Sequence, residues 1–134
     1  MLVVSSSDDP LDVDTAFNSG ADDYLVKSFT PKMLQDKVAE HLEALDVKRR
    51  NKVLIVDDSK VIRELLRHCF MKNGLNALTA EDGVKGIEII KSERPDVVVT
   101  DIEMPGLSGY ELCEELRRLP DMRDAFVVMM SSRN

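Results

Sequence analysis

The stretch Val53-Leu54-Ile55-Val56-Asp57-Asp58-Ser59 decides the fold, because four apolar residues run straight into two acids and a hydroxyl. An unbroken apolar run of this length is typical of a parallel strand that is covered on both faces. Parallel α/β sheets bind their ligands beyond the carboxyl ends of the strands. The sequence therefore predicts the two acids at the ligand-binding edge of a central strand.

Two further runs end on charged residues. Val97-Val98-Val99-Thr100-Asp101 ends on an acid, and Tyr24-Leu25-Val26-Lys27 ends on a lysine. Three acids at neighbouring strand ends would repel one another unless a cation were bound, and a carboxylate cluster suits Mg²⁺. A lysine can neutralise a phosphoryl group, and a serine hydroxyl can donate a hydrogen bond to it. Together these residue types predict phosphoryl transfer to a carboxylate.

Short apolar runs alternate with helical patterns along the chain, which predicts an α/β fold with a parallel sheet covered by helices. The predicted strands are 2–5, 24–26, 53–56, 77–79, 97–100 and 126–130, and the predicted helices are 11–19, 30–45, 60–73, 81–92 and 108–119. In the helix over 81–92 we expect Val84, Ile87 and Ile90 to face the core. The strands 2–5 and 126–130 both close on paired serines, so the same kind of element occurs twice.

Charge, cysteine content and hydropathy argue against a nucleic-acid-binding or membrane protein. The chain has 134 residues, a net charge of −7 and a pI near 4.8, which argues against nucleic-acid binding through a broad basic surface. Cys69 and Cys113 lie in helical patterns without metal-ligand spacing, and we interpret them as reduced core residues of a cytoplasmic protein. The sequence has neither an apolar stretch of membrane-spanning length nor a signal peptide, so no membrane partner is expected.

These strand-end residues resemble those of the receiver domain of bacterial two-component response regulators, of the CheY-like kind. Residues 53–134 look like the first part of that domain, from its first to its fourth strand, and residues 1–45 look like its last part, from the fourth strand to the fifth helix. Residues 46–52 would be a linker. The resemblance implies a flavodoxin-like, doubly wound parallel sheet with a duplicated fourth-strand element.

The resemblance also implies a magnesium-dependent phosphoacceptor. Asp101 would be phosphorylated by a histidine kinase, a phosphotransfer protein or a small acyl phosphate. Asp57, Asp58 and Asp101 would hold Mg²⁺ with help from the backbone carbonyl of Glu103. Such a domain transfers the phosphoryl group to itself and later removes it, so we expect a signalling domain and not a dedicated enzyme.

The remaining implied roles concern the phosphoryl group and the switch. Lys27 would pair with the phosphoryl group, and Ser131, or its duplicate Ser5, would be the switch hydroxyl that binds it. Tyr24 matches the aromatic switch residue that changes rotamer together with this hydroxyl. The family usually has Lys-Pro after the fifth strand, whereas this chain has Lys27-Ser28, so the loop beside the lysine departs from the family pattern.

The two halves stand in reverse order, and two accounts of this order remain open. In the first account, the chain spans the junction of two tandem receivers. In the second, it is a circular permutant in which the early half completes the late half. A five-stranded receiver has one slot for the fourth strand, and residues 2–5 and 126–130 both fit it. One copy is then displaced or added as a sixth strand, and exchange of halves between two chains would give a homodimer.

Two other functions fit parts of the pattern. The first is an interaction module or swapped dimer that keeps the receiver fold without being phosphorylated, which depends on whether Lys27 and a switch serine reach Asp101. The second is a phosphohydrolase of the haloacid-dehalogenase type, which needs an acid two residues after its nucleophile. Asp101-Ile102-Glu103 offers that arrangement only loosely, and the other motifs of these enzymes are not visible.

Overall fold

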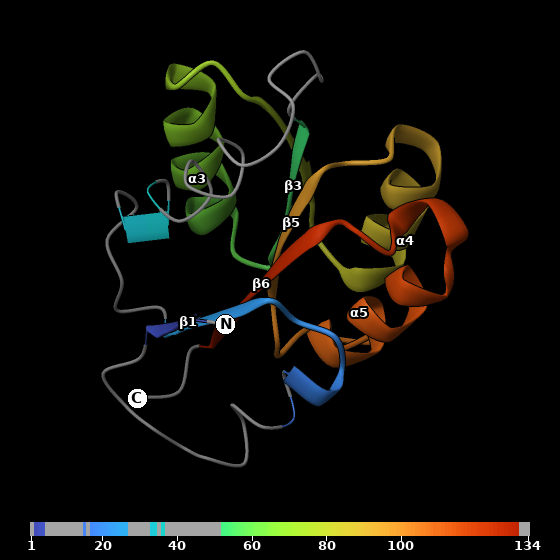
Figure 1. Cartoon of the computed structure of the whole chain (residues 1–134). Coiled ribbons are helices and arrows are strands. Elements are labelled where there is room, and N and C mark those ends of the chain that lie inside the picture. The colour runs from blue at the N-terminus through green and yellow to red at the C-terminus, as the bar shows by residue number, and fades with distance from the viewer. Residues whose placement is uncertain are drawn as a thin grey trace.

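The computed structural model describes residues 2–4, 15, 17–26, 33, 34, 36 and 52–131, and its centre is a six-stranded parallel sheet (Figure 1). The strands are β1 (Leu2–Val4), β2 (Asp23–Val26), β3 (Lys52–Val56), β4 (Asn76–Ala80), β5 (Val97–Asp101) and β6 (Phe126–Ser131). Their order across the sheet is β1-β2-β6-β5-β3-β4. The fold is α/β and receiver-like, as the sequence predicts.

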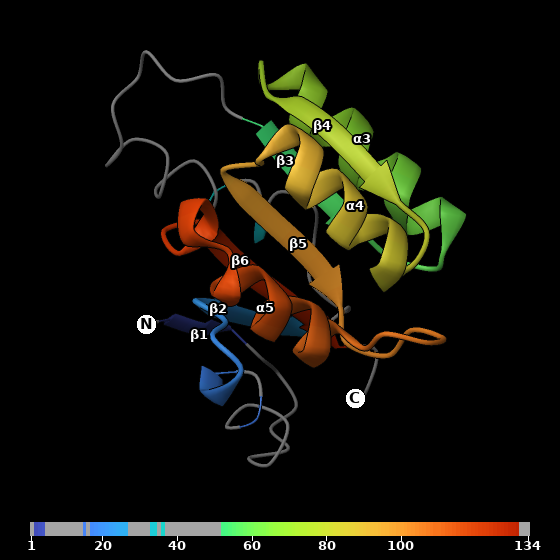
Figure 2. The ribbon, with the colours of Figure 1, turned by 90° about the vertical axis from the view of Figure 1, so that its right-hand side faces the viewer.

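Helices cover both faces of this sheet. Helix α3 (Lys60–Lys72) lies on one face, and α4 (Gly83–Glu93) and α5 (Gly109–Arg118) lie on the other (Figure 2). A short 3-10 helix, Pro120–Met122, follows α5. The three long helices begin after side-chain N-caps, which are Ser59, Asp82 and Ser108, and the last of these forms a capping box. In the part of the chain that the structure describes, no helix is long and apolar enough to cross a membrane.

The two strands predicted as central are central. Every residue of β5 is buried, and β3 is buried from Val53 to Val56. The strand predicted over 77–79 forms an edge of the sheet as β4. The predicted linker over 46–52 ends one residue too late, because Lys52 already belongs to β3. The Lys52 backbone nitrogen donates to Asp96 Oδ2 at 3.0 Å, and the Lys52 carbonyl oxygen accepts from the Asp96 backbone nitrogen at 2.9 Å. These bonds extend the strand.

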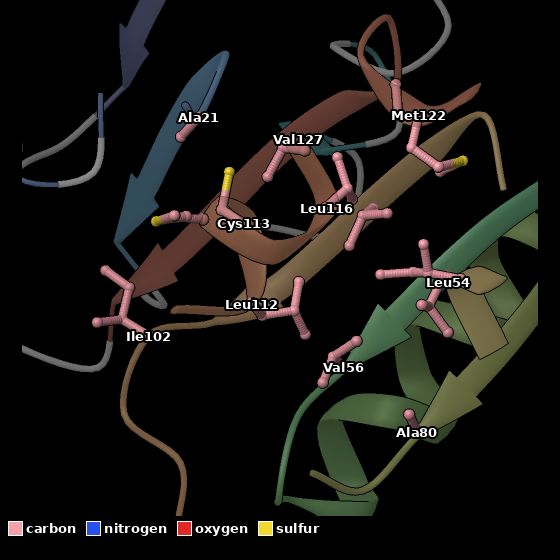
Figure 3. Close-up of a cluster of buried hydrophobic side chains, with 14 of the residues drawn as sticks. Ala21, Leu54, Val56, Ala80, Ile102, Leu112, Cys113, Leu116, Met122 and Val127 are labelled. Atoms are coloured by element: carbon pink, nitrogen blue, oxygen red, sulfur yellow. The ribbon is translucent and has the colours of Figure 1, made fainter. Parts of the chain in front are cut away.

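Each face of the sheet carries its own apolar core. The core under α4 and α5 contains Leu112, Cys113 and Leu116, which point from α5 toward the sheet (Figure 3). Burial raises the pKa of the Cys113 thiol to about 11 although the nearby Arg117 lowers it. Both cysteines are free thiols. Cys113 is buried as expected, whereas Cys69 is only partly covered.

The prediction for the inward face of α4 is wrong at Val84. This side chain is 58% exposed, and the buried residues of α4 are Gly83, Gly86 and Ile90. Ile87, also predicted to face inward, is partly buried and packs against the same core. A Cβ atom on Gly83 would lie 2.7 Å from the Leu107 carbonyl oxygen, and one on Gly86 would lie 3.0 Å from Leu112. The glycines let α4 approach its neighbours closely, and this approach turns Val84 toward solvent.

Segments from the beginning of the chain contribute to both cores. Ala21 lies in the core under α4 and α5 with Cys113 and Val127, and Leu34 is fully buried in the core on the α3 side. In the sheet, β2 pairs with β6 along its whole length, and β1 pairs with the outer edge of β2. The extra strand is therefore not inserted between β2 and β6.

Replacement of Leu34 by alanine is expected to lower the free energy of unfolding by about 2–5 kcal/mol, because this side chain is fully buried among Val53, Phe70 and Met130. The adjacent Met33 is 38% exposed, so Met33→Ala should cost less than about 1 kcal/mol. Urea unfolding of the two variants measures the difference. Equal losses would show that the early segment does not enter this core.

Candidate functional site

Three acids meet where β3 and β5 end. Asp57 and Asp58 follow β3, and Asp101 is the last residue of β5, its neighbour in the sheet. One carboxylate oxygen from each lies within 4.8 Å of the others. Asp57 and Asp101 are buried, at 0% and 2% exposure, and Asp58 is exposed. The cluster therefore has two buried carboxylates and one that is open to solvent.

The position of Asp57 is fixed from several sides. Its backbone nitrogen donates to the Ala80 carbonyl oxygen at 3.1 Å, which continues the pairing of β3 with β4. Its Oδ1 accepts a hydrogen bond from the Ser59 backbone nitrogen at 2.8 Å. Its carbonyl oxygen accepts from the Arg63 guanidinium at 2.7 Å, and Ser59 caps the helix that carries Arg63. These bonds hold the carboxylate at the start of α3.

The end of β5 is held equally closely. Ile102 donates its backbone N–H to the Met130 carbonyl oxygen at 3.1 Å, which ties the residue after Asp101 to β6. Gly109 donates to the Ile102 carbonyl oxygen at 2.9 Å. A Cβ atom on Gly109 would lie 2.4 Å from the Asp101 carbonyl oxygen, so only glycine fits at the start of α5. The phosphoacceptor candidate therefore sits on backbone that β6 and α5 both constrain.

The donor set fits a hard divalent cation. Carboxylate oxygens are the ligands that Mg²⁺ prefers, and it usually retains several waters. Two oxygens on one octahedral Mg²⁺ at ~2.1 Å lie between roughly 3 and 4.2 Å apart. A spread of at most 4.8 Å is close to this range, so small rotations of the exposed Asp58 side chain would suffice. The three acids at this short range also repel one another, which a bound cation would relieve.

The structure describes the other predicted site residues to different extents. Glu103 follows Asp101 by two residues and has an exposed side chain. The backbones of Tyr24 and Ser131 lie in β2 and β6, where Val26 is the register partner of Ser131. Their side chains, and the whole of Lys27 and Ser5, lie outside the described residues, so the predicted roles of these four residues remain predictions.

Sequence reasoning missed two residues that support the site, Arg63 and Gly109. Arg63 lies one helical turn after the cap Ser59, and this spacing, which places it over the end of β3, was the available signal. Gly109 follows the N-cap Ser108, a place where alanine would normally serve the helix better. A glycine at the first helical position is thus a sign of close backbone approach.

Comparison with known proteins agrees with this geometry. The family model of the response regulator receiver domain matches residues 53–134. Response regulator MprA of Mycobacterium ulcerans (strain Agy99) is 40% identical to the chain over 83 residues, which is 62% of this chain and 35% of that protein. Response regulator MprA of Mycobacterium avium (strain 104) is 39% identical over 83 residues, 62% of this chain and 36% of that protein. The chain thus spans about a third of the length of these curated relatives.

Solved structures show the same likeness. Chemotaxis protein CheY4 of Vibrio cholerae superposes with a TM-score of 0.61 at 29% identity over 64% of this chain and 72% of that chain. Response regulator protein TrrA of Thermotoga maritima, solved in complex with Mg(2+)-BeF, gives a TM-score of 0.58 at 36% identity over 63% of this chain and 71% of that chain. The chain belongs to the response regulator receiver domain family of two-component signalling.

Proposed function

We propose that this chain is a magnesium-dependent phosphoacceptor whose Asp101 receives a phosphoryl group from a histidine kinase, a phosphotransfer protein or a small acyl phosphate. The observation that carries the proposal is the cluster of Asp57, Asp58 and Asp101 oxygens within 4.8 Å at the ends of β3 and β5. The TrrA neighbour, solved with Mg(2+)-BeF, supports the same use of the site. We place the activity in the cytoplasm, where free thiols such as Cys69 and Cys113 stay reduced.

The chemistry follows from the residues present. A carboxylate oxygen of Asp101 attacks phosphorus and forms a new O–P bond, while the bond from phosphorus to the donor breaks. The donor, an acetate oxygen or an imidazole nitrogen, leaves with the electron pair. Asp57 and Asp58 would hold Mg²⁺ with Asp101, and the ion would supply neutralisation of the charge on the transferred group. The group that is phosphorylated belongs to the chain itself and not to a separate substrate, so the chain acts as a signalling domain.

The proposal assigns Lys27 and one serine to the bound phosphoryl group. Val26, the last residue of β2, is the register partner of Ser131, so the end of β2 that precedes Lys27 in the sequence lies on the same edge of the sheet as Asp101. We assign the switch hydroxyl to Ser131 and the aromatic switch to Tyr24, because β1, the strand that precedes Ser5 in the sequence, lies two strands beyond β6 in the sheet. The strand order favours Ser131 over Ser5 for this role.

We also propose that the halves 1–45 and 53–134 complete one receiver within a single chain. The position of β2 beside β6 supports this, because the order β4-β3-β5-β6-β2 is the doubly wound order of a five-stranded receiver. Strand β1 would then be an added sixth strand. A homodimer formed by exchange of these halves is the alternative.

Intact mass measurement after incubation with acetyl phosphate tests the phosphoacceptor function. The protein is expected to gain the mass of one phosphoryl group with Mg²⁺ and none when EDTA replaces the metal. Far-UV circular dichroism of the same samples serves as the control for folding. A folded protein that gains no mass with Mg²⁺ would contradict the proposal and favour the non-phosphorylated interaction module.

A further inference from the structure

The edge of β6 that faces β2 requires a partner. Strand β6 is buried from Val127 to Met130. Among the described strands of residues 53–134, the part that the family model matches, none pairs with the edge of β6 opposite β5. An exposed apolar edge of this kind pairs readily with other strands. The described structure fills it with β2, in register from Asp23 beside Val128 to Val26 beside Ser131. The question is what selects this strand and this register.

A single arginine on α5 joins the two parts. The Arg117 Nε and Nη2 atoms donate to the Gly20 carbonyl oxygen at 3.0 and 2.7 Å, and Nη2 also donates to Asp22 Oδ2 at 2.8 Å. On the other side Nη1 donates to the carbonyl oxygens of Arg123 and Ala125 at 2.8 and 2.7 Å. The planar guanidinium thus bridges the turn before β2 and the turn before β6.

Asp22 completes the junction and sets the register. Its backbone nitrogen donates to the Val127 carbonyl oxygen at 2.8 Å, and its Oδ2 accepts from the Val127 nitrogen at 2.8 Å. Both backbone groups of Val127 are therefore satisfied by one residue, and a shift of β2 by one position would break both bonds. The Asp22 carboxylate also pairs with Arg117, whose side chain is only 22% exposed. A charge-assisted pair of this kind contributes more than a neutral hydrogen bond.

The turn before β2 packs closely against α5. Gly20 has φ +105°, a conformation that favours glycine, and a Cβ atom there would lie 3.0 Å from Arg117 Cγ and 3.4 Å from Cys113 Sγ. The next residue, Ala21, is buried beside Cys113 and Val127 (Figure 3). The close packing at Gly20 and Ala21, the backbone hydrogen bonds of Asp22 and its ion pair with Arg117 therefore all lie within residues 20–22.

We propose that Arg117 and Asp22 form a clasp that docks the early segment of the chain, residues 17–26, on the edge of β6 and fixes its register. The occupant is the segment of the same chain, because β2 and β3 lie three strand spacings apart, ~14 Å. Residues 27–51 connect them, and a chain of that length can extend over ~80 Å. The inference concerns docking of the strand and holds whether or not Asp101 is phosphorylated.

Hydrogen–deuterium exchange of the full chain tests the clasp. Lysine at 117 keeps the charge but cannot reach Gly20, Asp22 and Ala125 together, so Arg117→Lys should speed amide exchange in β2 by about tenfold or more. Exchange in β3 and β5 should not change. The matched control is Arg118→Lys, since Arg118 is the next residue of the same helix, is 69% exposed and pairs with Glu115 of that helix. This control should leave β2 unchanged.

A second variant guards against a general loss of folding. Asp22→Asn keeps the side-chain shape at a position that is 42% exposed and removes the charged pair with Arg117. It should also speed exchange in β2, and the double variant Asp22→Asn/Arg117→Lys should add little to either single one. Equal β2 exchange in the Arg117 and Arg118 variants would overturn the proposal, as would faster exchange throughout β3 and β5. Protection of β2 that rises with protein concentration would show a strand supplied by a second copy, and would overturn docking within one chain.

Discussion

Replacement of Asp101 by asparagine is expected to abolish phosphorylation by acetyl phosphate completely. The amide oxygen of asparagine is too weak a nucleophile to accept the phosphoryl group, and the variant also withdraws one of the three candidate metal ligands. Asp101 is 2% exposed at the end of the central strand β5, so asparagine fills the same buried position without supplying a carboxylate. Intact mass spectrometry after treatment with acetyl phosphate and Mg²⁺ measures the effect.

The matched control for this variant is Asp124→Asn. Asp124 is exposed, lies before β6 and is not part of the acid cluster, so this variant should gain one phosphoryl group like the parent. A phosphorylated Asp101→Asn protein would show that another side chain is the acceptor, and the assignment of the site would then fail.

Replacement of Asp57 by asparagine is expected to have opposite effects on the metal-free and the magnesium-loaded protein. Each pair of charges in the cluster repels by roughly 1–3 kcal/mol at this separation, and removing one charge relieves two such pairs. The hydrogen bond from the Ser59 nitrogen can be kept by the amide oxygen of asparagine. The free energy of unfolding of the metal-free variant should therefore rise by about 1 kcal/mol after screening by solvent and salt.

Magnesium should stabilise this variant far less than the parent, because the cluster loses a buried anionic ligand. We expect the Mg²⁺ concentration at half-effect to rise by about tenfold or more, and phosphorylation to fall with it. Urea unfolding with and without Mg²⁺, for parent, Asp57→Asn and the control Asp124→Asn, measures both effects. If Asp57→Asn kept the full stabilisation by Mg²⁺, the acid cluster would not be the metal site.

The central strands and their acids were predictable from the sequence because two physical signals coincide in them. The runs before Asp57 and Asp101 are apolar without alternation, and only strands covered on both faces tolerate such runs. The rule that strand ends form the site then brought Asp57, Asp58 and Asp101 together, as the structure has them. The edge position of β4 followed from its weaker apolar pattern in the same way.

The residues that the sequence did not reveal act through close approach and long-range contact. Val84 fitted the apolar stripe of α4, yet Gly83 and Gly86 occupy the inward face because a larger side chain would not fit there. The clasp between Arg117 and Asp22 joins residues far apart in sequence, and periodicity carries no information on such a pair. Pairing of β2 with β6 was one of several arrangements that the reversed halves allowed, and only the strand order distinguishes among them.

The measurement that tests the central claim most directly is chemical identification of the phosphorylated residue. The parent protein is treated with acetyl phosphate and Mg²⁺, the acyl phosphate is reduced with borohydride, and the peptides are sequenced by tandem mass spectrometry. Reduction converts a phosphorylated aspartate to homoserine, and the account predicts homoserine at position 101 alone. Homoserine at another position, at Asp57 or Asp58 for example, or none in a protein that remains folded, would contradict it.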